Sequence, residues 1–429
     1  MTQTPPPSNT PKATQRGSVD RFAFVAMIAT LAAQAALRPT GPGNSSPVDV
    51  FILISILAAA IWVSSARVPV RAPYVVGVAL MVIGGAVAGA TGPLPGTAVL
   101  ALIQDLGLIA WCTALVAVAR TPHRLRMLAK AWAYAGAICA GVLLVGSLAH
   151  ITAITGIVAR EGNRVLFTFG DPNYAATYWV LTIFIIHACQ APRSRLARLL
   201  AYGLLVWALL LSESNGGVVE LALGCLLLVV LAALRRHGPA AAMATLLIIG
   251  GSAAVALQLV PFSSIQTWAR GSGQPILVNS LGRSNDSSAQ RGELLQEALQ
   301  LYNANGGLGS GPASTKPLLL ARSYPYAKEA HNDYLATLVE RGPVGLLGLI
   351  ALMASAAWRA GQIVRAGSAP PGPGALPKPA GLVAALFAVS VAATYYEVLH
   401  FRFVWALLAM AAALAFQCTE RRFDGRGQP

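Results

Sequence analysis

The stretch GVVELALGCLLLVVLAALRR, residues 217–236, decides what kind of fold this chain can adopt. Its apolar run contains one acid, Glu220, and no base until Arg235 and Arg236 end it. A helix of about 20 mostly apolar residues spans the hydrocarbon core of a bilayer and satisfies its own backbone hydrogen bonds there. We therefore predict a membrane-spanning helix that ends at the two arginines.

Similar apolar runs recur along all 429 residues, of which 55% are hydrophobic and only 11% charged. The mean hydropathy is +0.61, a value typical of proteins that cross a membrane many times. The sequence thus predicts an all-α polytopic membrane protein with about 12 transmembrane helices. The expected spans are residues 22–37, 48–65, 74–91, 97–119, 129–150, 172–190, 198–212, 217–234, 240–260, 343–358, 380–397 and 401–418.

The formal net charge of +15 could suggest a nucleic-acid partner, but its distribution argues against one. Most lysines and arginines fall in the tails and in the loops that lie on the same side of the membrane as the N-terminus. Cytoplasmic loops are enriched in these residues, so the charge indicates orientation, with both termini in the cytoplasm.

The polar residues divide the chain into five parts. Residues 1–21 are polar and proline-rich, and we expect a disordered cytoplasmic tail there. Residues 22–260 hold the first nine spans, residues 343–418 the last three, and residues 419–429 a second tail. Between the two sets of spans, residues 261–342 form a loop on the outer face. A loop of that length usually carries function.

The outer loop contains a predicted helix, SSAQRGELLQEALQLYNANGG, residues 287–307. Apolar residues recur at three- and four-residue spacing, and Arg291 falls on that apolar face near the N-terminus. A guanidinium fixed at a helix N-terminus is suited to binding phosphate. The alternative is an arginine that pairs with Glu293 or Glu297, and the local sequence leaves both readings open.

A second candidate lies at EAHNDYLATLVERGPVG, residues 329–345. Helical spacing places His331 on an apolar face close to the bilayer, followed by Asn332 and Asp333. A lone histidine on such a face is more often structural, but here Arg322 and further basic residues are near it in the sequence. This group of residues is too sparse in ligands for a metal site, and the five cysteines show no paired spacing.

An earlier outer loop, GIVAREGNRVLFTFGDPNYAATY, contributes Arg164 and Asn173. The alternative reading of this loop is a set of interfacial aromatic residues followed by a helix cap at Asp171. Two acids, Asp105 and Glu220, fall inside predicted spans. Such acids often couple transport to ions or protons, but each could simply bond to a neighbouring helix.

The motifs GDPNYAATY, QRGELLQEALQLYNANGGLGSGP and HNDYLATLVERGPVGLLGL, in this order, resemble the O-antigen ligase and polymerase superfamily of bacterial inner-membrane glycosyltransferases, with a GT-C-like fold. The resemblance covers roughly residues 160–350. One position departs from it: where the family often has an arginine between the seventh and eighth spans, this chain has Asn215.

The resemblance implies an O-antigen ligase, which transfers a polysaccharide from undecaprenyl diphosphate to a hydroxyl of the lipid A-core oligosaccharide. It implies a periplasmic active site at the inner membrane, an inverting reaction, and no metal or other cofactor. The catalytic residues would be His331, as general base, and Arg291, on the diphosphate. The implied substrate-binding residues are Arg164, Arg322, Asn173, Asn332 and Asp333. The nearest alternative is a polymerase of the same superfamily, and a different class is a transporter of glycans or anions.

Overall fold

Helices dominate the computed structural model, which describes residues 11–36, 45–157, 164–282, 286–321, 332–366 and 374–424. No strand occurs in these segments. The first half of the chain contains α1 (Pro11–Ala32), the 3-10 helix η1 (Ala33–Ala35), α2 (Pro47–Ala66), α3 (Val75–Thr91), α4 (Pro95–Val118), α5 (Pro122–Leu148), the short α6 (Thr152–Thr155), α7 (Pro172–Cys189) and α8 (Arg195–Leu211).

The second half contains the long α9 (Asn215–Leu259), α10 (Phe262–Gly271), α11 (Pro275–Asn279), α12 (Asp286–Ala304), α13 (Thr315–Ala321), α14 (Asp333–Ala366), α15 (Ala380–Ala392) and α16 (Arg402–Asp424). The residues at several helix N-termini explain why those helices begin where they do. Proline opens α2, α4, α5 and α7. Proline has no backbone N–H, and an N–H at the first helical position would have no partner within the helix. The carboxylate of Asp171 caps α7 by accepting from Asn173 N, which confirms the helix cap expected at that position.

Seven helices of the described segments are long and apolar enough to cross a membrane. They are Gly17–Ala35, Pro47–Ala66, Pro95–Val118, Pro122–Leu148, Asn215–Ala256, Asp333–Ala366 and Arg402–Glu420. The shorter apolar helices Val75–Thr91 and Ala380–Ala392 accompany them. The chain is therefore an all-α polytopic membrane protein.

The expected spans coincide with helices, but two details differ. Residues 217–234 and 240–260 lie in one long helix, α9, bent where Gly238 takes a φ of 84° before Pro239. The expected span over residues 380–397 extends too far, because α15 ends at Ala392. The backbone beyond it is hydrogen-bonded to the start of α14 instead of continuing its own helix.

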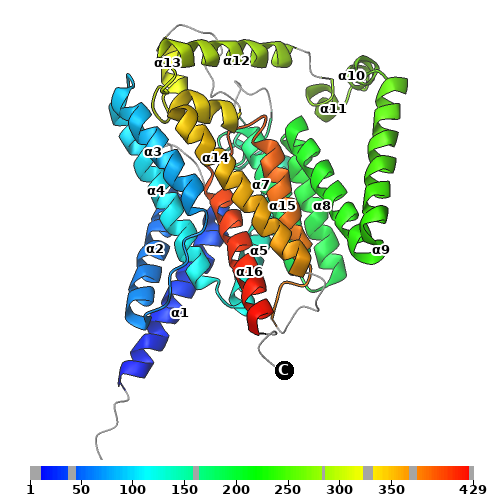
Figure 1. The fold of residues 1–429 in the computed structure, drawn as a ribbon. Coiled ribbons are helices and arrows are strands. Elements are labelled where there is room, and N and C mark those ends of the chain that lie inside the picture. The colour runs from blue at the N-terminus through cyan, green and yellow to red at the C-terminus, as the bar shows by residue number, and fades with distance from the viewer. Residues whose placement is uncertain are drawn as a thin grey trace, which may run out of the picture.

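In the ribbon, α10, α11, α12 and α13 lie across one end of the bundle, and the C-terminus lies at the other (Figure 1). We call the first the loop end and the second the C-terminal end. The second half of α9 rises along the side of the bundle and leads into α10 (Figure 1). Helices α10 to α13, including α12 over the one helix expected in this loop, therefore cover the loop end.

Helices α3 and α14 pack backbone to backbone. A Cβ on Gly348 would lie 2.5 Å from Met81 N, and one on Gly77 would lie 2.6 Å from Leu352 N. Small residues allow such close approach between membrane helices. Neither helix has room for a side chain at Gly77 of α3 or Gly348 of α14, so α14 runs in close contact with α3.

Candidate functional site

Arg164 and Asn173, both predicted to bind substrate, lie together at the loop end. Arg164 is only 9% exposed. Its Nη2 donates to Asn173 Oδ1 at 3.0 Å. The same oxygen accepts from Ser214 Oγ at 2.9 Å and from Tyr396 OH at 2.8 Å. The Nε of Arg164 donates to Ser212 O at 3.0 Å. This network joins α7, the turn before α9 and the segment after α15.

The turn between α8 and α9 also holds the start of the outer loop. Asn279, at the end of α11, donates to Glu213 Oε1 at 3.1 Å. Asn215, which stands where the family often has an arginine, donates from Nδ2 to Ser280 O at 3.1 Å. The side chain at this position therefore binds the outer loop directly.

Asn332 and Asp333 bind backbone across a second junction. Asn332 Oδ1 caps α14 by accepting from Tyr334 N at 2.9 Å and from Leu335 N at 3.1 Å. Its Nδ2 donates to Thr394 O at 2.9 Å. The Asp333 carboxylate accepts from Val398 N at 2.9 Å and from Leu399 N at 3.4 Å. Both side chains hold the connection between α15 and α16 against the start of α14, and this same connection carries Tyr396.

The predicted catalytic residues are only partly placed. His331 and Arg322 lie outside the described residues. Arg291 lies on α12, and its side chain is not among those described. The residue after His331 is hydrogen-bonded to the α15–α16 connection, which also joins the network around Arg164. The structure therefore brings the segments that carry Arg164, Asn173, Asn332 and Asp333 to one place.

A latch between the outer loop and α14 lies beside this junction. Pro343 has no N–H and therefore leaves the carbonyl of Val339 without its helical donor; Ser310 N donates to it at 2.8 Å. Gly311 N donates to the carbonyl of Glu340 at 3.0 Å. The carboxylate of Glu340 accepts from Ala313 N at 2.8 Å. The motif segments around residues 310 and 340 are thus bound to each other at the bend of α14.

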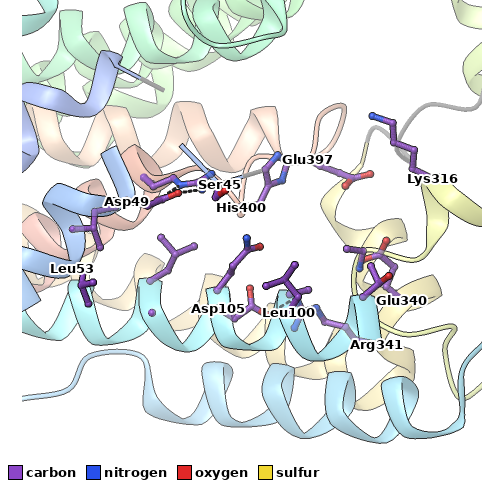
Figure 2. A pocket seen from close by; sticks show the side chains of 18 of the residues that line it. Ser45, Asp49, Leu53, Leu100, Asp105, Lys316, Glu340, Arg341, Glu397 and His400 are labelled. Carbon is purple, nitrogen blue, oxygen red and sulfur yellow. Dashed lines mark hydrogen bonds and ion pairs between the residues drawn. The ribbon is translucent and has the colours of Figure 1, made fainter. Parts of the chain in front are cut away.

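A cavity of about 610 Å³ opens at the loop end between α2, α4, α13, α14 and the α15–α16 connection (Figure 2). Apolar side chains such as Ile52, Leu53 and Leu108 form much of its wall. Its polar rim consists of Asp49, Asp105, Lys316, Glu340, Arg341, Glu397, His400 and Arg402. This size and mixture suit a ligand that is partly apolar and partly hydrophilic.

Two ion pairs balance the arginines of this rim. Arg341 Nη2 lies 2.7 Å from Asp105 Oδ2. Arg402 forms a bidentate ion pair with Asp49, donating from Nε to Oδ1 at 2.9 Å and from Nη2 to Oδ2 at 2.7 Å. The expectation that Asp105 bonds to a neighbouring helix is thereby confirmed. The other acid inside a span, Glu220, is also held, since Thr177 Oγ1 donates to it at 2.8 Å.

Sequence reasoning missed the role of the α15–α16 connection. The motif YYEVLHFR was visible there, and Tyr396, Glu397, His400 and Arg402 all belong to it. Its Tyr396 binds Asn173, and three of its side chains line the cavity. The available signal was a run of polar and aromatic residues where the predicted spans 380–397 and 401–418 meet. Among the described residues, no group of three or more His, Cys, Asp and Glu side chains could hold a metal ion.

Residues 200–350 match the model of the O-antigen ligase family. This segment contains α9 to α13, the α8–α9 turn and the bend of α14, which are the elements that build the loop end. No curated protein matches the chain. The sequence motifs, the all-helical membrane fold and this match over residues 200–350 all support the O-antigen ligase superfamily.

Proposed function

We propose that this protein is an O-antigen ligase. It transfers a polysaccharide from undecaprenyl diphosphate to a hydroxyl of the lipid A-core oligosaccharide, at the periplasmic face of the bacterial inner membrane. The observation that carries the proposal is the family match over residues 200–350, because this segment contains the outer loop with Arg291, Arg322 and His331.

The proposed reaction is a direct displacement at the anomeric carbon of the donor. His331, as a neutral imidazole, takes the proton of the acceptor hydroxyl while the oxygen of that hydroxyl forms the new glycosidic bond. The bond between the anomeric carbon and the diphosphate oxygen breaks, and undecaprenyl diphosphate leaves with both electrons. Attack opposite the leaving group inverts the anomeric centre.

The departing diphosphate gains negative charge, and guanidinium groups stabilise it best through two parallel hydrogen bonds. We assign this role first to Arg291 and then to Arg322. Arg164 and Asn173 support the substrate from the wall of the site, where their mutual hydrogen bond fixes them. Asn332 and Asp333 shape the site by fixing the start of α14 beside the α15–α16 connection.

The cavity at the loop end supports an amphiphilic substrate. Its apolar wall between α2 and α4 accepts a hydrocarbon chain, and its polar rim accepts the glycan end. The reaction needs no nucleotide sugar, because the glycan arrives on a lipid carrier.

Reconstitution tests the proposal directly. Purified protein in lipid vesicles is supplied with undecaprenyl-diphosphate-linked polysaccharide and lipid A-core, and product is followed by gel mobility. Glycan-bearing lipid A-core is the expected product. Lengthened lipid-linked glycan, with lipid A-core unchanged, would assign the protein to the polymerase branch.

A deletion strain distinguishes a ligase from a transporter. If the deleted protein is a ligase, the strain has bare lipid A-core, and polymerised lipid-linked glycan accumulates on the periplasmic side. If it is a transporter, the glycan stays on the cytoplasmic side. The ion pair of Asp105 and the hydrogen bond of Glu220 favour the enzyme, since both acids already have a partner within the bundle.

A further inference from the structure

Three distant segments meet at the C-terminal end of the bundle, around the end of α7. Lys378 N donates to Ala188 O at 3.1 Å, which ties the residues before α15 to α7. A Cβ on Gly374 would lie 3.3 Å from the Cβ of His123, so the same segment also touches the start of α5. The starts of α5 and α15 and the end of α7 therefore form one continuous surface.

Basic residues are frequent on this surface. We call four of them the basic cluster: Arg126, Lys130, Arg193 and Lys378. Arg126 and Lys130 stand one helical turn apart on α5, which places these two cations side by side. A neighbouring arginine, Arg198, is already used, since its Nη1 donates to Pro192 O at 3.1 Å.

No carboxylate among the described side chains neutralises the basic cluster. The ion pairs described at this end join Arg71 to Glu420 and Arg124 to Asp20. The Nε of Arg126 is buried and has no hydrogen-bond partner among the described residues. A buried donor without a partner destabilises the fold, and mutual repulsion among the cations adds to this cost. An anion with several acceptor oxygens would relieve both.

The geometry points to a binding site for the phosphate of an anionic phospholipid headgroup at the basic cluster. The cluster lies at the ends of membrane-spanning helices, where lipid headgroups gather. Phosphate offers several oxygens to Arg126, Arg193 and the two ammonium groups at once. Basic pockets between transmembrane helices are known to select anionic headgroups in this way. The site is separate from the loop end and does not depend on glycan transfer.

Lipid titration of the full-length protein in detergent tests this site. The probes are phosphatidylglycerol, zwitterionic phosphatidylcholine and inorganic phosphate, and the readout is the midpoint of thermal unfolding. Phosphatidylglycerol should raise the midpoint, whereas phosphatidylcholine should not. At about a fivefold loss per basic residue, R126Q/K130Q should need about twenty-fivefold more phosphatidylglycerol for the same shift.

The matched control is R235Q/R236Q, which removes the same charge from the bend of α9 at the same end and should keep the native response. If R126Q/K130Q does not fold, R193Q/K378Q replaces two exposed members of the cluster and should weaken the response similarly. An unchanged response in the cluster variants, or an equal loss in the control, overturns the site. A cluster-dependent shift with inorganic phosphate but not with phosphatidylglycerol overturns the lipid assignment and leaves a site for free phosphate.

Discussion

The guanidinium of Arg341 lies 2.7 Å from the carboxylate of Asp105, in the wall of the cavity at the loop end (Figure 2). Asp105 belongs to α4, well inside its span, and Arg341 stands just before the bend of α14. The pair therefore links the bundle to the segment that begins with Asn332. Both side chains are mostly buried, so the loss of one would leave the other as a buried charge without its partner.

A double-mutant cycle on this pair should show coupling. Asp105→Asn and Arg341→Gln should each lower the unfolding midpoint in detergent, because each leaves a buried charge without its partner. The double variant should lose less than the sum of the two, by about 0.5–3 kcal/mol. Strictly additive losses would mean that the two charges do not support each other.

The sequence predicted the helices well, whereas the contacts among the candidate site residues depend on the tertiary fold. Long apolar runs such as residues 217–234 define membrane helices by themselves, since a bilayer leaves no other way to satisfy the backbone. The roles of Asn173 and Asp333 could not be predicted, because their partners, Tyr396 and Val398, are more than sixty residues away in the sequence. Only the tertiary fold brings these residues together.

The His331 variant tests the proposed general base. His331→Ala should reduce glycan transfer by about 10²- to 10⁴-fold while membrane insertion is retained. His237→Ala is the matched control, since His237 is an exposed imidazole at the far bend of α9. Transfer is measured with lipid-linked polysaccharide and purified lipid A-core. Near-normal transfer by the His331 variant would remove the imidazole from the mechanism.

Arg291→Lys should also lose most transfer activity, because an ammonium cannot form the two parallel hydrogen bonds of a guanidinium. The loss should be at least about tenfold, the equivalent of one hydrogen bond to a charged group. Arg236→Lys, at the opposite end of the bundle, controls for the general effect of this exchange. If Arg291→Lys works normally while Arg291→Ala does not, a simple positive charge is sufficient at this position.

Asn173 should tolerate aspartate better than alanine. Its three described side-chain contacts all use Oδ1 as the acceptor, from Arg164, Ser214 and Tyr396. Asn173→Ala removes the acceptor oxygen that these three groups share, at a cost of about 1–3 kcal/mol, whereas Asn173→Asp keeps an acceptor oxygen. Thermal unfolding in detergent measures the difference. Equal stability of the two variants would show that the network does not depend on this oxygen.

Gly342 should be the least replaceable glycine of α14. Its φ of 65° is unfavourable for residues with a Cβ, and a Cβ there would lie 2.4 Å from the carbonyl oxygen of Leu308. Gly342→Ala must therefore open the latch between the outer loop and α14, with a loss of more than about 1 kcal/mol and reduced glycan transfer. Gly361→Ala is the control within the same helix, because nothing lies within 4 Å of its added Cβ. Since alanine favours a helix more than glycine does, this control should be neutral or slightly stabilising. If the two variants unfold at the same temperature, the bend at Gly342 does not hold the outer loop in place.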